Sequence, residues 1–426
     1  MTRTREKNWS SILIAGGLLA ITSLDSRAQD ISCIVGDCPG LDVALNYTAD
    51  LRRNTSGGLE RGTAASGLLH AGVAYTSDRL VPGAMVVTSA SLIHTGGADI
   101  SGRYVGDLQG LNNIEADGAL RLYDFWTEIR FGRGMATRIG FQDLNAEFDA
   151  PVTSSFFIGP PFGIGTDLAQ TGENGPAVFP VTSLGVRFTG KAGELTQWRL
   201  AAYDAVPGRA GQKDFVALDV SRRQGALLIG EIEHAARGFN KVAVGAWTYT
   251  SKFERLDAGA TGDATRRTGN RGAYAVADRP LGDIGGVHLD GMLRAGFASG
   301  SFNASRQYLG GAVVASRLLE SRPDDALGLA VAHVRTSSSF RRQLSFDGGS
   351  PGKTETQLEL TWRAPLADWV AVVPGAQWVN RPGADANVRD AFVIGMRFEF
   401  ALQHTWPMVV RQDGPGSDTP VVMTSP

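Results

Sequence analysis

The sequence contains little lysine, only two cysteines and, beyond its N-terminal region, no long apolar run. A membrane-spanning helix needs about 18 or more consecutive apolar residues, and no stretch after residue 28 approaches that length. Cys33 and Cys38 could form a local disulfide in an oxidising compartment, whereas no histidine lies near them to complete a metal site. The formal net charge of -2 gives no indication of a nucleic-acid partner. These features disfavour a helical membrane protein and a nucleic-acid-binding protein.

Arginine supplies most of the positive charge. A planar guanidinium can hold a fixed orientation along a wall and can donate hydrogen bonds to neutral hydroxyl groups. A GC-rich genome would produce the same bias, so a functional and a neutral explanation both stay open. Of 41 basic residues, the only lysines are Lys7, Lys191, Lys213, Lys241, Lys252 and Lys353.

The beginning of the chain has the pattern of a secretion signal. Met1–Trp9 carries three basic residues, residues 12–24 are largely apolar, and a site suited to signal peptidase ends at Ala28. We expect a signal peptide over residues 1–28 and a short N-terminal segment with the cysteine pair over residues 29–40. An exported chain without a spanning helix is either soluble in the periplasm or medium, or a β-barrel in a Gram-negative outer membrane.

The stretch from Ala391 to Phe400 alternates between apolar and polar residues with the period of two that a β-strand has. One face carries large apolar side chains, among them Phe392 and Phe398, and the other carries Arg397 and Glu399. A wall between lipid and water has this pattern, and so does an amphipathic edge strand of a soluble sandwich. This stretch alone leaves both interpretations open.

The same alternation recurs along the chain. A soluble sandwich rarely places Arg or Glu in the middle of so many strands. The chain between residues 29 and 400 could hold on the order of sixteen strands with their connections. We therefore predict an all-β fold, a transmembrane antiparallel β-barrel that forms one domain over residues 41–400. The alternating segments are residues 41–51, 68–76, 125–131, 183–189, 197–203, 288–297 and 358–363.

One connection differs from the others. Residues 149–180 are rich in proline and contain Phe156, Phe157, Phe162 and Phe179, an unusual composition for a surface loop. These phenylalanines need a place to be buried. We predict that this long loop folds into the barrel lumen and narrows it. Packing on a neighbouring wall or on another subunit is the alternative.

Several segments carry a family resemblance. Glu355–Gly383 reads E-T-Q-L-E-L-T-W-R-A-P-L-A-D-W-V-A-V-V-P-G-A-Q-W-V-N-R-P-G and is the most specific of them. Tyr308–His333 contributes Y-L-G-G and S-R-P-D-D-A-L-G-L-A, with support from G-F-Q-D at Gly140–Asp143 and F-P at Phe179–Pro180. Together they resemble the carbohydrate-selective porin family, the OprB-like outer-membrane proteins. The resemblance implies a sixteen-stranded barrel that passes sugars by diffusion without a cofactor or energy coupling.

The C-terminus departs from this family. Barrels of this kind usually end on an aromatic residue that the barrel-insertion machinery recognises, whereas residues 401–426 continue past Phe400 with several prolines. We expect this tail to be disordered. Its presence leaves open whether Phe400 still acts as the insertion signal.

Strand parity assigns a set of side chains to the pore lining. A sugar pore needs charged or amide groups that hydrogen-bond hydroxyls, and aromatic faces against which a sugar ring can lie. Each charge could instead pair with a neighbour across strands and never contact solute, so the set is better supported than any member. The predicted pore-lining and substrate-contacting residues are Trp126, Glu128, Arg130, Arg187, Arg199, Asp290, Arg294, Glu359, Arg363, Arg397 and Glu399, with Phe156, Phe157 and Phe162 from the long loop.

The sequence gives no indication of an enzyme. Its histidines form no H-E-x-x-H spacing and no G-x-S-x-G motif is present. We expect no catalytic, cofactor-binding or metal-binding residues and predict a passive channel for mono- or small oligosaccharides. The alternatives are a general diffusion porin, an outer-membrane β-barrel lipid hydrolase and a secreted β-rich binding protein.

The expected partners are small-molecule sugars, outer-membrane lipid and, during biogenesis, the barrel-insertion machinery. A wall that faces a second copy of the chain is as apolar as a wall that faces lipid. Monomer and trimer therefore both stay open, as does the preferred sugar.

Overall fold

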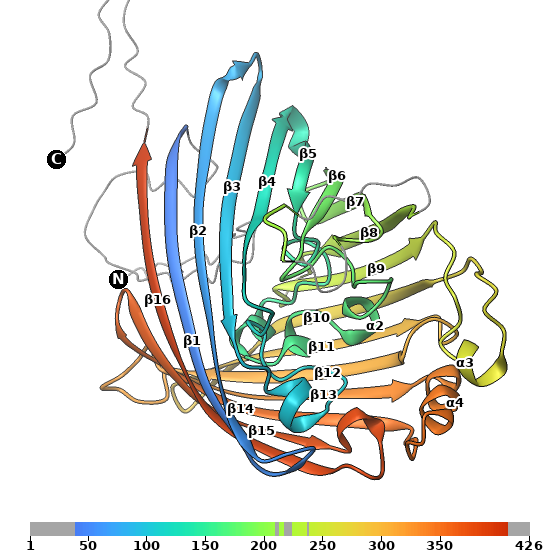
Figure 1. The fold of residues 1–426 in the computed structure, drawn as a ribbon. Helices are drawn as coiled ribbons and strands as arrows, with labels where there is room; N and C mark the ends of the chain where they lie inside the picture. The colour runs from blue at the N-terminus through green and yellow to red at the C-terminus, as the bar shows by residue number, and fades with distance from the viewer. Residues whose placement is uncertain (1–38, 209–212, 217–223, 237, 408–426) are drawn as a thin grey trace, which may run out of the picture.

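Sixteen antiparallel strands form one closed barrel in the computed structural model, which describes residues 39–208, 213–216, 224–236 and 238–407 (Figure 1). The predicted signal peptide, Cys33 and Cys38 lie outside these residues. The strands are β1 (Gly40–Gly58), β2 (Gly62–Val81), β3 (Ala84–Gly97), β4 (Ala119–Phe131), β5 (Met135–Gln142), β6 (Ser183–Ala192), β7 (Thr196–Asp204), β8 (Ala226–His234), β9 (Lys241–Tyr249), β10 (Arg271–Ile284), β11 (Val287–Ala298), β12 (Ser305–Ser316), β13 (Ala326–Thr336), β14 (Thr354–Ala367), β15 (Val370–Asn380) and β16 (Arg389–Pro407).

Short helices occur only in the connections of the described chain. Figure 1 shows α2 inside the ring of strands, and α3 beside α4 at one rim. None of the described helices is long and apolar enough to cross a membrane. The helices are η1 (Ser101–Val105), η2 (Gly132–Gly134), η3 (Thr153–Phe156), α1 (Pro160–Gly163), α2 (Thr166–Ala169), α3 (Ala258–Thr261), α4 (Ser338–Phe346) and η4 (Pro382–Ala384).

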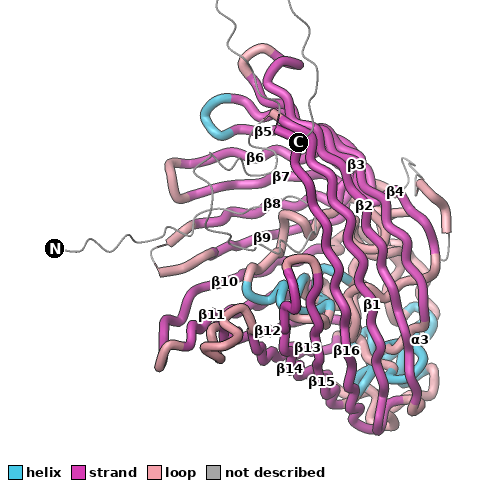
Figure 2. Tube along the Cα trace, turned by 90° about the vertical axis from the view of Figure 1, so that its left-hand side faces the viewer, coloured by secondary structure: helices cyan, strands magenta, loops and turns pink. Residues whose placement is uncertain are grey.

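The barrel closes by pairing its first and last strands. Each strand pairs with its neighbours in sequence, and β1 pairs with β16 in a register that runs from Gly40 opposite Pro407 to Gly58 opposite Arg389. These two strands lie side by side in Figure 2. Closure leaves no sheet edge with unpaired backbone groups, which is the condition for a β-structure to span lipid.

The two faces of each strand differ as the alternation predicts. Phe392, Ile394 and Phe398 are 41%, 45% and 40% exposed on the outer wall, whereas Arg397 and Glu399 point inward and are 3% and 8% exposed. The same outward-apolar, inward-polar arrangement holds in the other predicted strands, from residues 41–51 to residues 358–363. The outer wall therefore offers the apolar surface that lipid requires.

The two rims of the barrel are unlike. At one rim the connections are mostly tight turns, such as residues 82–83, 193–195 and 285–286. At the other rim lie long loops, among them the β3–β4 loop (residues 98–118) and the β5–β6 loop (residues 143–182). We refer to these as the short-turn rim and the long-loop rim. In outer-membrane barrels short turns face the periplasm and long loops face the cell exterior.

The strand boundaries differ from the predicted ones at both ends of the barrel. Strand β1 continues beyond the predicted segment of residues 41–51 to Gly58, through bulges that keep it paired with β16. Strand β16 continues past Phe400 to Pro407, so the first part of the predicted disordered tail is strand, held by the opposing start of β1. Residues 408–426 lie outside the described part of the chain.

Candidate functional site: the barrel lumen

The β5–β6 loop lies against the inner wall of the barrel, as predicted. It contains η3, α1 and α2, and its polar groups bond to inward-facing side chains of β8, β10, β11 and β14. Contacts with the inner faces of these strands require that the loop fold inward from the long-loop rim. Figure 1 shows it between opposite sides of the wall.

Arg294 on β11 is the strongest anchor of this loop. Its Nε and Nη2 donate to Asp149 Oδ1 and Oδ2 at 2.7 and 2.6 Å, and its Nη1 donates to Asp167 Oδ1 at 2.5 Å. All three side chains are at most 1% exposed. The fork of a guanidinium matches a carboxylate in two parallel bonds. Arg294 therefore holds both ends of the α1–α2 region against the wall and has no surface left for solute.

Two acidic wall residues hold the backbone of the same loop. Glu359 on β14 accepts hydrogen bonds from the backbone N–H groups of Ile158 and Gly159 at 2.7 and 2.9 Å. Asp278 on β10 accepts from both the backbone N–H and the hydroxyl of Thr153 at 2.7 Å. A carboxylate that receives several such bonds is satisfied without an ion pair. These acids position the loop, and Glu359 is buried beneath it.

The predicted loop aromatics have a packing role. Phe157 and Phe162 are 2% and 1% exposed and join a hydrophobic cluster with inward residues of β11, β12 and β13, while Phe156 is partly buried at its edge. Tyr308 on β12 donates its hydroxyl to the backbone oxygen of Pro161 at 2.6 Å. The expectation that all three phenylalanines lie open to solute is therefore not met, because the apolar wall beneath the loop takes up their faces.

The β3–β4 loop also enters the lumen, which the sequence interpretation did not anticipate. Arg397 on β16 donates to Asp50 on β1 at 2.8 Å and to the side-chain oxygens of Asn112 and Asn113 in this loop at 3.0 and 2.7 Å. Gln377 on β15 donates to the backbone oxygen of Leu111 at 2.8 Å. The loop therefore covers the inner faces of β1, β15 and β16.

Acidic residues gather within the β3–β4 loop. Burial, together with a hydrogen bond and the charge of Asp99, raises the pKa of Glu115 to about 9. Burial also raises the pKa of Asp107 to about 6. Glu355 on β14 accepts from the backbone N–H of Leu108 at 2.8 Å and adds a further carboxyl group. This cluster is stable only while part of it carries protons.

The wall from β4 to β9 carries a continuous network of ion pairs. Glu128 binds Arg130 at 2.6 Å, Arg138 at 2.7 Å and Arg187 at 2.5 Å. Glu147 of the β5–β6 loop extends the network, because it binds Arg138 at 2.7 Å and Arg187 at 2.6 Å. Burial alone would raise the pKa of Glu147, but the two guanidiniums outweigh it and hold that pKa below its ordinary value.

The network reaches β9 through Arg199 and Lys241. Arg199 binds Glu231 at 3.1 Å and Glu233 at 2.8 Å, and Lys241 lies 3.6 and 3.5 Å from the same two carboxylates. Glu231 also accepts a hydrogen bond from the backbone N–H of Asp149 at 2.9 Å. The ion-pair network therefore contacts the same loop residue that Arg294 binds. Buried pairs of this kind fix geometry, because the loss of one partner leaves an uncompensated charge.

Trp126 lies on the lumen side, as predicted, but its ring is covered. The guanidinium carbon of Arg138 lies 3.8 Å from the ring centroid, and Trp126 is 6% exposed. A guanidinium over an indole face is a favourable cation–π contact. The ring therefore supports the arginine row and does not present a face to solute.

Four predicted charges keep lumen exposure. The side chains of Arg130 and Asp290 are 31% and 30% exposed, and those of Arg363 and Glu399 are 18% and 11% exposed. Arg363 donates to Glu399 at 2.9 Å, and Asp290 lies 3.5 Å from His288. These are the groups among the predicted set that a passing solute can reach. The others are buried in pairs or under loops.

Several residues of the lumen were missed by the sequence interpretation. Arg138 and Glu231 lie on inward positions of β5 and β8, and the period-two pattern of those strands would have found them. Asp149 and Asp167 lie in a loop without periodicity, so no local signal identifies them as partners of Arg294. Within the described ranges, His, Cys, Asp and Glu side chains nowhere gather in threes in a geometry that could hold a metal ion.

Comparison with known families and structures agrees with this architecture. The model of the carbohydrate-selective porin, OprB family matches residues 78–402. Among curated proteins none matches this chain in sequence. The structure of Pseudomonas putida OprB at high pH is similar with a TM-score of 0.75 and 17% identity, over 85% of this chain and 94% of that chain.

Two other outer-membrane proteins have a related fold. The channel DcaP of Acinetobacter baumannii has a TM-score of 0.50 and 12% identity, over 85% of this chain and 98% of that chain. OmpT of Vibrio cholerae, in a trimer form, has a TM-score of 0.50 and 11% identity, over 86% of this chain and 100% of that chain. At such identities the likeness concerns the barrel fold alone.

Proposed function

Because this chain belongs to the carbohydrate-selective porin, OprB family, we propose that mono- and small oligosaccharides diffuse passively through its lumen. The protein is a porin of the Gram-negative outer membrane. The observation that carries the finer proposal is the β5–β6 loop, which Arg294 and Glu359 fix against the inner wall. A loop held in this way narrows the lumen permanently, so a solute must pass the charged groups beside it.

Charged side chains with partial exposure supply the contacts for a sugar. Arg130 and Arg363 offer guanidinium donors, and Glu399 and Asp290 offer acceptors. Each already has a partner in the wall, so a hydroxyl group can add a hydrogen bond without requiring a full negative charge on the solute. Weak, multiple contacts are what a channel requires, because a tightly bound solute would not leave.

Liposome swelling with neutral solutes of graded size tests this proposal. We expect glucose and a disaccharide to enter faster through the protein than polyols of the same size, and we expect added sugar to reduce the single-channel ion current. Equal rates for sugars and size-matched polyols would identify a general diffusion porin. Absence of step conductance in a planar bilayer would contradict a channel of either kind.

Arg363→Ala sharpens the assignment of the contact groups. The change removes a guanidinium that is 18% exposed and pairs with Glu399. We expect the rate of disaccharide entry to change by about twofold to tenfold, the equivalent of one net hydrogen bond. Arg79→Ala is the matched control, since Arg79 is an exposed arginine at the short-turn rim. Equal effects of both variants would exclude a specific role for Arg363.

The oligomeric state is a further proposal. OmpT of Vibrio cholerae is seen in a trimer form, which supports self-association of this chain without establishing it. Sedimentation in detergent distinguishes a monomer from a trimer. Recognition by the barrel-insertion machinery stays a prediction. Because β16 extends to Pro407, a test of the insertion signal has to include the residues after Phe400 as well as Phe400 itself.

A further inference from the structure

A basic cluster lies on the outer surface at the long-loop rim of β10–β13. Arg335 points outward, because its neighbours Val334 and Thr336 are buried on the inner face of β13. No carboxylate among the described residues forms an ion pair with any member of the cluster. The cluster consists of Arg271 at the start of β10, Arg306 on β12 and Arg335 on β13, all of them exposed. Lys353 is exposed at the same rim, but it lies opposite the inward-facing Thr336 and is not counted as part of the outer surface.

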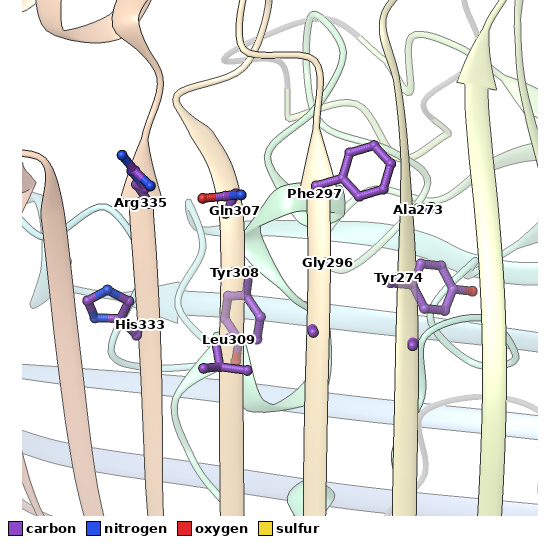
Figure 3. A pocket seen from close by; sticks show the side chains of 11 residues that line it. Ala273, Tyr274, Gly296, Phe297, Gln307, Tyr308, Leu309, His333 and Arg335 are labelled. Carbon is purple, nitrogen blue, oxygen red and sulfur yellow. The ribbon is translucent and has the colours of Figure 1, made fainter.

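Polar residues extend this cluster down the outer wall. Gln307 pairs with Arg335 across β12 and β13, and one level nearer the middle of the wall His333 pairs with Leu309 (Figure 3). His333 Nδ1 lies 2.8 Å from the hydroxyl oxygen of Thr356. The polar row continues on β14, where Thr354 lies opposite Arg335 and Thr356 lies opposite His333. A row of polar side chains on the outer wall suits lipid headgroups better than acyl chains.

An apolar groove begins beside these polar groups. It has a volume of about 680 Å³, with the small side chains of Ala273, Ala275 and Ala295 as its floor and the larger Phe297 and Leu309 as its sides (Figure 3). Alanines on neighbouring strands leave a depression that larger outward residues elsewhere fill. The groove is therefore shaped to receive a flexible hydrocarbon chain alongside the basic cluster.

The position of the cluster selects one type of occupant. Long loops face the cell exterior, so these cations lie at the level of the headgroups of the outer leaflet. Basic side chains at a membrane surface attract anionic headgroups. A second copy of the chain that used the same patch in a two-fold dimer would bring three cations against three cations. The charge therefore favours an anionic lipid over a two-fold partner.

We propose that the basic cluster and the alanine groove bind a phosphorylated, acylated glycolipid of the outer leaflet. Its phosphate groups contact Arg271, Arg306 and Arg335, with Gln307 and His333 below them, and one acyl chain lies in the groove. Arginine suits this task because its planar fork binds phosphate oxygens in pairs. The site lies on the outer wall, so it is independent of the sugar path through the lumen.

Native mass spectrometry of the full-length protein in detergent, titrated with purified lipid A, tests the proposal. Each cation near a membrane surface strengthens lipid binding by about fivefold. We therefore expect the triple variant Arg271→Ala, Arg306→Ala, Arg335→Ala to bind lipid A about a hundredfold more weakly than wild type. Arg79→Ala, at the opposite rim, should bind as wild type does. The shift in gel mobility on heating verifies that each variant is folded.

The groove and the headgroup are tested separately. Ala295→Trp fills the floor of the groove with a side chain that lipid tolerates, and we expect it to weaken binding of lipid A while leaving single-channel conductance unchanged. Dephosphorylated lipid A should bind wild type no better than it binds the triple variant. Equal binding of the phosphorylated and dephosphorylated lipids would overturn the proposal.

Other occupants are outcomes of the same experiments. Full displacement of lipid A by millimolar inorganic phosphate would identify a site for free anions and would overturn the lipid assignment. Cross-links between two copies through cysteine placed at Arg335, together with loss of the oligomer in the triple variant, would show that a second copy covers the patch. Failure of wild type to bind lipid A at all would also overturn it.

Discussion

The two loops inside the barrel are held by different chemistry. The β5–β6 loop is fixed by opposite charges, with Asp149 and Asp167 on Arg294, and by phenylalanines packed on the wall. The β3–β4 loop is fixed at one end by neutral amides on Arg397, and it contains acids that lie near one another. Burial raises the pKa of Asp143 and of Asp149 in the first loop to about 6, whereas the pKa of Glu115 in the second loop is raised to about 9. Above neutral pH, attachment of the second loop is therefore the more sensitive to pH.

The two loops therefore narrow the lumen in different ways, because one is held more firmly against the wall than the other. Removing one partner of a buried ion pair leaves a charge without compensation, so the β5–β6 loop can be released only at high cost. Buried carboxyl groups with raised pKa values give up stability as they ionise, so the β3–β4 loop can loosen without a mutation. The same lumen thus contains one fixed element and one that external conditions can modulate.

Arg294→Met should cause the largest difference between the two loops, because it weakens attachment of the β5–β6 loop alone. It leaves Asp149 and Asp167 buried without a counter-charge, and we expect the attachment of the β5–β6 loop to weaken by about 3–5 kcal/mol. Hydrogen exchange in residues 143–182 should rise, and single-channel conductance should increase. Adding Asp149→Asn and Asp167→Asn should recover part of the loss. Unchanged exchange and conductance would mean that apolar packing alone holds the loop.

Asn113→Ala should have an intermediate effect confined to the β3–β4 loop. It removes a hydrogen bond of 2.7 Å from the charged Arg397, and such bonds contribute about 1.5–3 kcal/mol. Exchange in residues 98–118 should rise while exchange in residues 143–182 stays as in wild type. Arg397 keeps Asp50 as its partner, so the barrel itself should unfold as before. A matching rise in both loops would show that they are attached as one unit.

A rise of pH above neutrality should have a smaller effect, and it should be largest in the β3–β4 loop. The pKa values of Glu115, about 9, and Asp107, about 6, lie above their ordinary values of 4.5 and 3.8, so the attached loop binds protons that the released loop gives up. Attachment is then most stable below about pH 4 and weakens as pH rises toward 9. Hydrogen exchange corrected for its intrinsic pH dependence measures this.

Glu115→Gln provides the control for the pH experiment. The amide cannot ionise, so most of the rise in exchange between pH 5 and pH 9 should disappear in residues 98–118. Residues 143–182 should show little change between pH 7 and pH 9 in either protein, because the raised pKa values of Asp143 and Asp149 are about 6. A pH response that persists in the variant would assign it to groups other than Glu115.

Arg130→Ala should have the smallest effect on stability and sets the baseline. Its side chain is 31% exposed and pairs with Glu128, which also binds Arg138 and Arg187, so the acid stays compensated. We expect a change of about 0–1 kcal/mol in the free energy of unfolding and no change in exchange of either loop. Loss of barrel insertion would contradict the placement of Arg130 on the water-filled side.

Much of the wall could be predicted from the sequence, and the reason is its periodicity. The alternation of Phe392, Ile394 and Phe398 with Arg397 and Glu399 depends on the two-residue repeat of a strand, which is a local property. Most of the predicted lumen charges alternate with exposed apolar neighbours in the structure for the same reason. The proline and phenylalanine content of residues 149–180 likewise indicated a loop that needed burial.

The availability of those charges to solute was not predictable. Parity says that Glu359 and Arg294 point inward, but it contains no information about which loop covers them. The β3–β4 loop is polar and short of aromatic residues, so its composition gave no reason to place it inside. The loop residues that bind these wall charges were not predicted either. Asp149 and Asp167 bind Arg294, and Asn113 binds Arg397, each across more than a hundred residues of the chain.

The sequence by itself determined a barrel with an apolar outside and a charged inside, because side-chain direction in a strand follows from position alone. Only the tertiary structure decided which charges remain in contact with water. That outcome depends on two loops folding across the lumen and on the buried ion pairs that fix them, and both bring together residues that no local pattern connects.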